Sequence, residues 1–287
     1  MPVKNPKKAV HPPQQQARPG RHEKMKPVPE TNPISRGSNM LKGKNVLITG
    51  GDSGIGKAVA KLFALEGANI AIAYLSETDD ASETCAEVKD YGVDCLLIKT
   101  DLSKEANCRK TVQKTVRQFG SIDILINNIA LHWEQKSLTD IITDQLIKTF
   151  TTNVYSYFWT TRYALEHMKK GACIINSSSV TAYRGSDSLI DYAATKAAII
   201  GFTRSLAANL VMKGIRVNAV APGPIWTPLI VSSFRKEKVA AFGSDAPMKR
   251  PGQPNEIAPS YLFLALEENS YMTRQVLHPN GGEIVNA

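Results

Sequence analysis

The stretch NVLITGGDSGIGKAVAKLFALEGANIAIAY, residues 45–74, decides the fold. It begins with a short aliphatic run, passes through a glycine-rich turn into an amphipathic segment that ends at Gly67, and returns to a second aliphatic run. Runs of this length fit buried strands, and the amphipathic pattern between them fits a helix. A strand, a helix and a second strand at this spacing form a right-handed parallel crossover. The stretch therefore predicts the first unit of a parallel sheet.

The same alternation continues to the end of the chain. Five more aliphatic runs predict strands at residues 93–100, 123–128, 172–176, 215–223 and 275–279. Helical patterns follow the second strand up to residue 91, and then lie at 104–119, at 143–168, through YAATK to residue 212, and at 256–266. Seven strands alternating with six helices predict an α/β fold of the Rossmann type, a doubly wound, seven-stranded parallel sheet with helices on both faces.

The glycine-rich turn is the first candidate functional feature. Gly50, Gly54 and Gly56 stand between the first predicted strand and the first predicted helix. A diphosphate approaches a backbone closely only where no Cβ intervenes, and such a turn needs residues that tolerate positive φ. The turn therefore predicts a dinucleotide site. Its other members are Asp52, Ser53 and Ile55.

Other strand ends lie at the same edge of the sheet, where open parallel sheets bind their ligands. Tyr74 and Leu75 end the second predicted strand. Asp101 and Leu102 follow the third, where we expect them to hold an adenine amino group and to cover its ring. Asn127, Asn128, Ile129 and Ala130 end the fourth, where a turn of small residues leaves room for a ribose. Turn capping is the alternative role of the asparagines and is compatible with this one.

Tyr192 and Lys196 form the candidate catalytic pair. They are four residues apart in a segment that reads as a helix, so their side chains share one face. A lysine cation about 4 Å from a phenol contributes about 4 kcal/mol, enough to bring the phenol pKa from about 10 to about 7. Ser179, in a serine cluster after the fifth predicted strand, is placed to donate to a carbonyl substrate. An ordinary amphipathic pair and a polar turn are the alternative.

Charge is concentrated at the start of the chain. The protein has 287 residues and a net charge of +9, and residues 1–42 hold nine lysines and arginines against two glutamates. The rest is nearly neutral, so we expect no nucleic-acid binding by the domain. Residues 1–40 also hold eight of the 16 prolines, which predicts a basic, proline-rich extension that is disordered or laid along the surface. Binding of acidic partners or of a neighbouring subunit is its alternative role. Residues 41–287 form the single catalytic domain.

The four cysteines, Cys85, Cys95, Cys108 and Cys173, show no C-x-x-C spacing. We therefore expect free buried thiols, with no metal site and no disulfide framework. No apolar run reaches the roughly 18 residues of a spanning helix, so no membrane partner is expected. The N-terminal residues lack the apolar core of a signal peptide, and the expected location is the cytoplasm.

Taken together, the motifs resemble the short-chain dehydrogenase/reductase family. They are the glycines at 50, 54 and 56, the pair Asn127–Asn128, Asn153, Ser179, Tyr192, Lys196, and Pro222–Gly223. APGPIWTPL and RPGQP resemble a bacterial branch of general-stress and glucose or ribitol dehydrogenase-like proteins. The resemblance implies an NAD(P)-dependent oxidoreductase that transfers a hydride between nicotinamide and a small carbonyl or alcohol substrate.

The resemblance also implies roles for single residues. Tyr192 would be the proton donor or acceptor, Ser179 would orient the carbonyl, and Lys196 would lower the tyrosine pKa and hold the nicotinamide ribose. Asn153 would fix a water in a proton relay. Helices near 153–169 and 190–212 would pair subunits in a homotetramer. The expected cofactor-binding residues are Gly50, Asp52, Ser53, Gly54, Ile55, Gly56, Tyr74, Leu75, Asp101, Leu102, Asn128, Ile129, Ala130, Tyr192, Lys196, Pro222, Gly223, Ile225 and Thr227.

Departures from the family pattern concern the cofactor and the last strand. Ile129 and Ala130 stand where alanine and glycine are usual, which adds bulk near the cofactor. Arg274 and Pro279 replace a glycine and a strand former, so the last strand is expected to end early or to lie at an edge. Asp52, with Glu77 nearby, would repel a 2′-phosphate. NAD is therefore the predicted cofactor, with NADP as the alternative.

The substrate does not follow from the motifs. Loops expected around the site mouth carry His132, Trp133, Tyr183, Arg184, Trp226 and Phe234. This mixture suits a sugar, a polyol or a small aldehyde or ketone, and packing of a mobile lid explains it equally well. The alternative function is a non-catalytic dinucleotide-binding or scaffold protein. A nucleic-acid binder that acts through the basic extension would need aromatic residues among the basic ones, and the extension has none.

Overall fold

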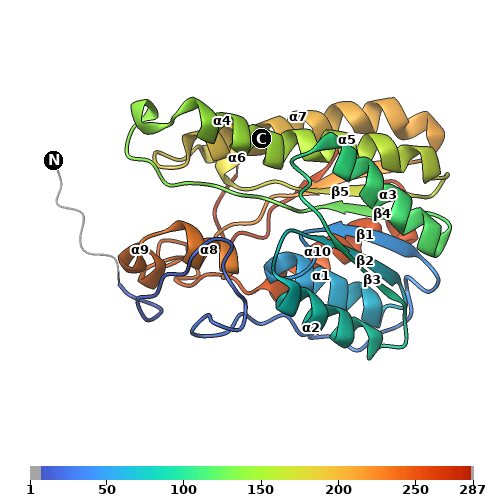
Figure 1. Cartoon of the computed structure of the whole chain (residues 1–287), viewed down its shortest axis with the longest axis horizontal. Helices are drawn as coiled ribbons and strands as arrows, with labels where there is room; N and C mark the ends of the chain where they lie inside the picture. The colour runs from blue at the N-terminus through green and yellow to red at the C-terminus, as the bar shows by residue number, and fades with distance from the viewer. Residues whose placement is uncertain (1–7, 286–287) are drawn as a thin grey trace.

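Seven parallel strands form one sheet at the centre of the molecule (Figure 1). The computed structural model describes residues 8–285. The strands are β1 (Asn45–Thr49), β2 (Asn69–Tyr74), β3 (Cys95–Lys99), β4 (Ile124–Asn127), β5 (Cys173–Ser177), β6 (Arg216–Val220) and β7 (Val276–Leu277). Their order is β3-β2-β1-β4-β5-β6-β7, so the chain winds outward from β1 in one direction and from β4 in the other. The predicted Rossmann-type, doubly wound α/β fold is confirmed.

Helices cover both faces of the sheet (Figure 1). One face carries α1 (Gly54–Leu65), α2 (Thr78–Lys89) and α10 (Pro254–Ala265), and the other carries α3 (Glu105–Phe119), α4 (Thr143–Phe150), α5 (Ser156–Ala164) and α7 (Ile190–Leu210). The short helices are α6 (Thr181–Arg184), α8 (Pro228–Ser233) and α9 (Lys236–Ala240), and 3₁₀ turns lie at Leu138–Asp140, Leu165–His167, Val211–Lys213 and Glu267–Asn269. Among the helices within residues 8–285, none is both long and apolar enough to cross a membrane.

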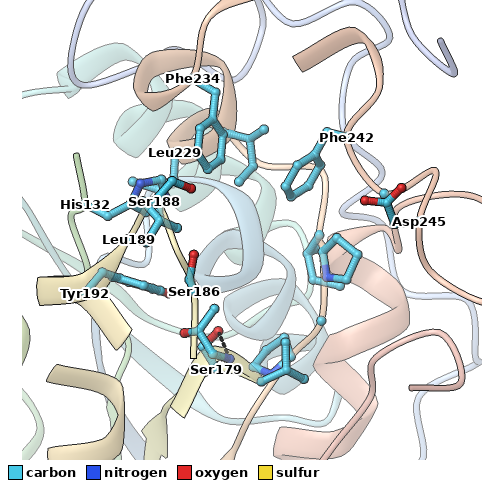
Figure 2. Close-up of a pocket in the computed structure, with 18 of the residues that line it drawn as sticks. His132, Ser179, Ser186, Ser188, Leu189, Tyr192, Leu229, Phe234, Phe242 and Asp245 are labelled. Atoms are coloured by element: carbon cyan, nitrogen blue, oxygen red, sulfur yellow. Dashed lines mark hydrogen bonds between the residues drawn. The ribbon is translucent and has the colours of Figure 1, made fainter. Parts of the chain in front are cut away.

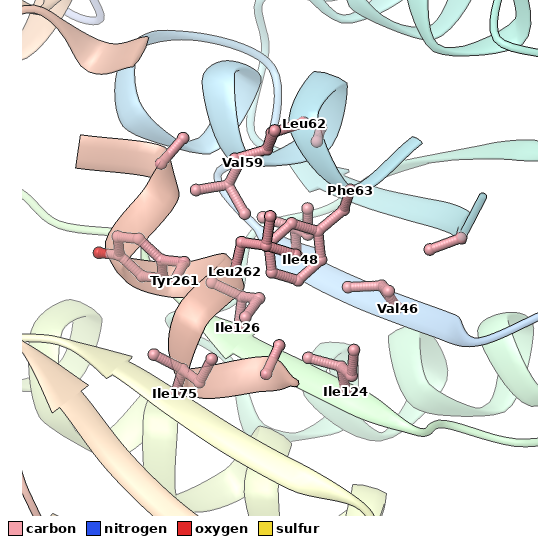
Figure 3. Close-up of a cluster of buried hydrophobic side chains, with 14 of the residues drawn as sticks. Val46, Ile48, Val59, Leu62, Phe63, Ile124, Ile126, Ile175, Tyr261 and Leu262 are labelled. Atoms are coloured by element: carbon pink, nitrogen blue, oxygen red, sulfur yellow. The ribbon is translucent and has the colours of Figure 1, made fainter. Parts of the chain in front are cut away.

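Alternating side chains of the central strands fill two cores. Val46 and Ile48 of β1 belong to the cluster beneath α1 and α10, together with Phe63 and Leu262 (Figure 3). Leu47, between them in sequence, belongs to the cluster on the opposite face. Strands buried on both faces are continuous apolar runs, which is why the sequence pattern located them. The rigid sheet fixes the turns at the carboxyl ends of its strands, where the site is built.

The predicted helix at 143–168 is interrupted. A π-helical turn at Thr151–Tyr155 separates α4 from α5 and contains Asn153, whose side chain is fully buried. A π turn widens the helix by one residue and leaves local backbone carbonyls without their usual partners, and such turns occur often at functional sites. Hydrophobic periodicity does not reveal this turn because it continues across it.

The last strand is shorter than the predicted 275–279. It comprises only Val276–Leu277 and lies at the sheet edge beside β6. Pro279 has no N–H to donate to a ladder, and Arg274 adopts a φ of +64°, outside the strand region. The expectation of an early end and an edge position is therefore met.

The expectation of four free thiols is wrong for two of them. Cys85 of α2 and Cys95 of β3 form a disulfide with 5.7 Å between their Cα atoms. Cys108 and Cys173 are free and buried. The α2–β3 crossover brings together two cysteines that are ten residues apart, a proximity that their spacing in the sequence does not indicate.

The N-terminal segment, residues 8–40, lies along the domain from α9 and α8 to α1 and α2 (Figure 1). The backbone N–H of Val10 donates to Ala240 O at 2.8 Å, and that of Gln16 donates to Val231 O at 2.8 Å. Met25 is 1% exposed, in a cluster with Trp226 and Phe234. Residues 1–7 of the predicted extension, and 286–287 of the predicted domain, lie outside the described residues.

We expect Met25→Ala to lower the free energy of unfolding by about 2–5 kcal/mol, because it removes a buried side chain that the segment inserts into the domain. Urea unfolding followed by circular dichroism measures the change. Val28→Ala is the matched control on the same segment: Val28 is 51% exposed, and its truncation is expected to change stability by at most about 0.5 kcal/mol. Equal effects of the two variants would show that the segment is not docked in solution.

Candidate active site

A cavity of about 840 Å³ lies beyond the carboxyl ends of β5 and β6 (Figure 2). Its walls come from the loops that follow β4, β5 and β6, from the start of α7, and from α8 and α9. The labelled lining residues are His132, Ser179, Ser186, Ser188, Leu189, Tyr192, Leu229, Phe234, Phe242 and Asp245. Hydroxyl groups and apolar rings share the cavity, and a volume of this size suits a small organic substrate beside a cofactor ring.

The glycine turn between β1 and α1 fits a diphosphate. Gly50 and Gly54 adopt φ values of +67° and +52°, and a Cβ on Gly56 would lie 1.8 Å from Gly50 O. Ser53 is the N-cap residue of α1, yet its side chain makes no capping hydrogen bond, and the first turn of α1 holds no acidic residue. The backbone amides of this helix end are therefore open to an anion.

The turn after β4 is locked to the glycine turn. Asn128 Nδ2 donates to Gly50 O at 3.0 Å, and Ser177 Oγ donates to Asn128 Oδ1 at 3.0 Å. The bulkier Ile129 is accommodated because it packs against Ala73 and Leu102. Ala130 continues this turn. The structure thus brings Asn128 and Ile129 against the glycine turn, and the ribose contact of Asn128, Ile129 and Ala130 stays a prediction.

The residues predicted for the adenosine end lie at the ends of β2 and β3. Tyr74 is buried and Leu75 is 54% exposed. Asp101 accepts hydrogen bonds from Ser103, at 3.0 Å from its N–H and at 2.6 Å from its Oγ, and Leu102 is buried. Leu75 is therefore available to cover an adenine ring. One oxygen of the Asp101 carboxylate already accepts the two hydrogen bonds from Ser103 in its own turn.

The segment after β6 closes against the glycine turn. Pro222 O accepts a hydrogen bond from Val180 N–H at 3.1 Å. Gly223 passes so close to Asn280 that a Cβ would lie 2.7 Å from its Cα. Thr227 caps α8 and lies beside Gly54, where a Cβ would meet Thr227 Cγ2 at 3.1 Å. Ile225, between them in sequence, is buried. The diphosphate end and the substrate end of the site are thus adjacent.

Tyr192, Lys196 and Ser179 meet at the base of the cavity. Tyr192 and Ser179 line it, and Lys196 lies behind the tyrosine with its Nζ 5.6 Å from the centre of the tyrosine ring. Lys196 is 1% exposed, and its Nζ donates to Ser177 O at 2.8 Å. The structure therefore brings together the three side chains that the sequence placed on two separate elements.

The predicted acidification of Tyr192 by Lys196 is wrong, because the pKa of Tyr192 lies above its ordinary value. Burial raises the pKa of Tyr192 to about 12, against which a hydrogen bond with Ser179 acts in the lowering direction. Burial also lowers the pKa of Lys196 to about 7, so the lysine is only partly charged at neutral pH. Burial acts on both groups in the same sense, because removal from water favours the neutral phenol and the neutral amine.

The Asn153 side chain is committed to neighbouring backbone and side-chain groups. Its Oδ1 accepts from Leu131 N–H at 2.9 Å, and its Nδ2 donates to Leu131 O at 2.9 Å and to Thr195 Oγ1 at 3.1 Å. These bonds tie the loop after β4 to α7, directly behind Tyr192. The amide therefore positions the loop after β4 against α7, and the predicted role of Asn153 in holding a water stays a prediction.

Only some residues expected at the mouth line the cavity. His132, Arg184 and Phe234 do. Trp226 is fully buried in the cluster with Met25, and its Nε1 donates to Pro27 O at 2.8 Å. The other two pack elsewhere: Trp133 lies under Arg18, with the guanidinium carbon 4.9 Å from the ring centre, and Tyr183 packs edge-on against His278.

Sequence reasoning missed contributors that come from distant segments. Ser177 anchors both Lys196 and Asn128. The run of three serines at 177–179 was the available signal, but only Ser179 was singled out. Lys99, the last residue of β3, donates from Nζ to Oγ1 of Thr78 at the start of α2 at 3.3 Å, and Arg21 lies 3.5 Å from Asp79 in the same turn of α2. No pattern in the sequence indicates that the N-terminal segment reaches this point.

Comparisons with known proteins find oxidoreductases that are similar over almost the whole chain. Residues 50–283 match a family model described as enoyl-(acyl carrier protein) reductase. The chain is 54% identical to an uncharacterized oxidoreductase, YhxC, of Bacillus subtilis, covering 98% of this chain and 99% of that one. It is 52% identical to NADPH-dependent aldehyde reductase 1, chloroplastic, of Arabidopsis thaliana, covering 95% and 98%. It is 50% identical to glucose and ribitol dehydrogenase of Daucus carota, covering 96% and 97%.

Solved structures agree as well. A short-chain dehydrogenase from Burkholderia cenocepacia in complex with NADP superposes with a TM-score of 0.80 at 32% identity, covering 85% of this chain and 98% of that one. A 3-ketoacyl-(acyl-carrier-protein) reductase from Brucella melitensis complexed with NADH gives a TM-score of 0.77 at 31% identity, covering 84% and 98%. These likenesses favour a catalytic, nicotinamide-dependent protein over the alternative of a non-catalytic scaffold.

We expect the stability of the protein to rise between pH 7 and 9 through Lys196. Its folded-state pKa of about 7 lies below the ordinary 10.5, so the unfolded chain binds more protons throughout this window. Stability therefore increases with pH, by about 2 kcal/mol from this residue alone. Urea unfolding of the wild type and of Lys196→Met at pH 7, 8 and 9 measures the difference. Tyr192→Phe is the control that keeps the dependence, and parallel curves for wild type and Lys196→Met would contradict the assignment.

Proposed function

The chain belongs to the short-chain dehydrogenase/reductase family, and we propose that, as an NAD(P)-dependent oxidoreductase, it interconverts an alcohol and a carbonyl compound at the cavity beside Tyr192. The observation that carries the proposal is the meeting of Tyr192 and Ser179 in one cavity, with Lys196 behind them and the glycine turn alongside. Substrate classes that suit the hydroxyl and apolar walls are sugars, polyols and small aldehydes or ketones.

Tyr192 is protonated at rest, as a proton donor in carbonyl reduction must be. A reduced nicotinamide, when bound, would supply the hydride for the carbonyl carbon. Tyr192 donates its O–H proton to the carbonyl oxygen, and Ser179 donates a hydrogen bond to the same oxygen. Because burial holds the tyrosine pKa near 12, the phenol carries this proton at neutral pH. In the direction of alcohol oxidation, the phenolate accepts the proton.

Lys196 is suited to return a proton to Tyr192 after the tyrosine has donated its own. Its pKa of about 7 lets it hold or release a proton close to neutral pH. Its Nζ is held by Ser177 O, so the ammonium stays beside the tyrosine ring during turnover. We assign to Asn153 the positioning of the loop at Leu131 through its amide, and to its main chain the contact with a relay water.

We assign each part of the cofactor to residues that follow one or two of the strands. The amides at Gly50–Gly56 bind the diphosphate, with Asp52, Ser53 and Ile55 in the same turn. Tyr74, Leu75, Asp101 and Leu102 surround the adenosine, and Asn128, Ile129 and Ala130 border the riboses. Pro222, Gly223, Ile225 and Thr227 follow the nicotinamide, with Tyr192 and Lys196 at its ribose.

NADP is the cofactor that we favour, although the sequence predicted NAD from the charge of Asp52. Burial raises the pKa of Asp52 to about 6, so the carboxylate is still mostly ionised at neutral pH and the preference for NADP rests on other groups. Lys99 lies beside Thr78 at the start of α2, next to the loop that follows β2, where a 2′-phosphate is read in this fold. The Arabidopsis relative named for its use of NADPH supports the same choice.

Homotetramer formation and a cytoplasmic location are further parts of the proposal. Tyr155 and Phe158 on the α4–α5 side are each 48% exposed, and Phe158 stacks on Phe202 of α7 with 4.0 Å between ring centres. Exposed aromatic side chains on adjacent helices suit burial between subunits. The cytoplasmic location rests on the sequence alone.

We expect Tyr192→Phe to lower kcat for aldehyde reduction by 10²–10⁴-fold, because it removes the proton donor and leaves the ring in place. A panel of sugars, polyols and aldehydes with NADPH and NADH, followed by absorbance of the reduced nicotinamide, first finds a substrate. Tyr183→Phe is the matched control, since Tyr183 lies outside the cavity, and it should retain wild-type rates. Fluorescence of bound NADPH should persist in both variants. Equal activity of Tyr192→Phe and wild type would refute the assignment.

We expect the wild type to bind NADPH more tightly than NADH and Lys99→Ala to reduce that preference by about fivefold, because a partly exposed charge contact contributes about 1 kcal/mol. Dissociation constants measured by cofactor fluorescence give the ratio. Lys89→Ala, in the last turn of α2, is the control for loss of charge alone. Preference of the wild type for NADH would restore the prediction made from Asp52.

A further inference from the structure

Two short helices form one wall of the cavity. α8 has six residues and α9 has five. Isolated helices shorter than about 12 residues are marginal in water, so α8 and α9 depend on contacts with the rest of the chain. With the residues next to them, they contribute to the lining Leu229, Ile230, Phe234, Glu237, Lys238 and Phe242 (Figure 2). The shape of this wall therefore depends on what holds the two helices.

The N-terminal segment, which runs past α9 and α8, hydrogen-bonds the carboxyl-terminal end of each (Figure 1). The last four carbonyls of a helix have no partner within that helix. Val231 O, in the last turn of α8, accepts from Gln16 N–H at 2.8 Å. Ala240 O, at the end of α9, accepts from the N–H groups of Val10 at 2.8 Å and His11 at 3.0 Å. The segment thus supplies donors that the two helices lack.

The segment also packs closely against the start of α8. Gly20 is buried, and a Cβ on it would lie 2.5 Å from Pro228 O. Trp226, two residues before Pro228, donates from Nε1 to Pro27 O at 2.8 Å and packs against the ring of His11, with 4.0 Å between centres. Contacts on both sides of Gly20 in the sequence therefore hold the segment against the outside of this wall.

Arg18 joins the same segment to a second wall, the loop after β4. Its Nη1 donates to His132 O at 2.6 Å, and its guanidinium carbon lies 4.9 Å from the centre of the Trp133 ring. His132 lines the cavity and Arg18 does not. Because Gln16 and Gly20 lie on either side of Arg18 and contact α8, one short stretch of chain touches both walls from outside.

We propose that residues 10–27 act as a strap that holds α8, α9 and the loop after β4 around the substrate cavity, with Arg18 as a positioning residue. The proposal rests on the proposed function, since it takes the substrate to bind beside Tyr192. Lining residues on α8 and α9 lie around the substrate and not at its reacting atoms. Loosening the strap therefore raises KM more than it lowers kcat.

Gly20→Ala tests the strap at α8, with the aldehyde that the panel above identifies. Its new Cβ pushes the segment away from Pro228, so kcat/KM should fall at least about tenfold, mainly through KM. Gly37→Ala is the matched control in the same segment. A Cβ there would lie 2.5 Å from the backbone O of Leu65, which does not line the cavity. Gly37→Ala should lower the thermal midpoint as Gly20→Ala does and leave KM at its wild-type value.

Arg18→Met tests the strap at the loop after β4 and introduces no clash, so it covers the case of a glycine variant that folds poorly. Loss of a charged hydrogen bond should raise KM for the aldehyde about fivefold. Arg18→Lys keeps a donor and should recover part of the loss. Lys24→Met, at an exposed basic residue of the same segment, is the matched control and should keep the wild-type KM.

Hydrogen exchange followed by mass spectrometry gives a readout without substrate. Peptides covering residues 228–242 should exchange at least about fivefold faster in Gly20→Ala than in the wild type, and those covering 131–136 should do so in Arg18→Met, because local opening becomes easier where the strap is released. Peptides covering residues 45–74 should exchange at the wild-type rate in both variants.

The outcomes separate two failures. Equal changes of KM in Gly20→Ala and Gly37→Ala, or unchanged exchange at residues 228–242 in Gly20→Ala, would overturn the strap and leave the proposed function standing. A wild type that is inactive on every compound of the panel with either cofactor would overturn the proposed function, and the exchange rates would then decide whether the strap holds these walls.

Discussion

The site depends on one cation that the fold keeps out of water. Lys196 is buried on α7, its Nζ is bound to Ser177 O, and it faces the rings of Tyr157 and Tyr192, both 5.6 Å away. A carbonyl and two π faces offset only part of the lost hydration, so the lysine pKa falls to about 7. Ser178 Oγ donates to Lys196 O at 2.8 Å and joins α7 to the end of β5. The residues at the end of β5 thus offset part of the cost of burying Lys196 by bonding to its side chain and backbone.

The N-terminal segment forms part of the same structure. It has too few aliphatic residues to build a core of its own, and it docks instead by backbone hydrogen bonds and by inserting Met25 beside Trp226. That cluster also contains Phe234 and contacts Tyr192, so the segment supports the roof of the cavity. Arg18, also in this segment, hydrogen-bonds the backbone O of His132 and so contacts the loop after β4. A segment whose composition indicates a solvated extension thus reaches two walls of the site.

Sequence patterns predicted the features that short-range periodicity sets. They did not predict the features that tertiary packing sets. The seven strands, the glycine turn and the helical spacing of Tyr192 and Lys196 are read from short-range periodicity, and the structure contains them all. Trp226 was placed at the mouth, but its neighbours Met25 and Pro27 come from about 200 residues away and bury it. The direction of the Tyr192 pKa shift was wrong for the same reason, because a loss of solvation depends on every element that covers the group.

Burial also sets the protonation state of Tyr192 at rest. A phenol with a pKa near 12 is a proton donor at rest, and the chain alone supplies no full positive charge to make it a phenolate, since Lys196 is itself half-neutral near pH 7. Oxidation of an alcohol needs the phenolate, so that direction requires further positive charge beside Tyr192, which an oxidised nicotinamide carries. Reduction needs a hydride, which a reduced nicotinamide would supply, and the proton that the tyrosine already holds. The resting site is therefore prepared for the proton-donating half of the reaction, and burial of the tyrosine is the physical cause.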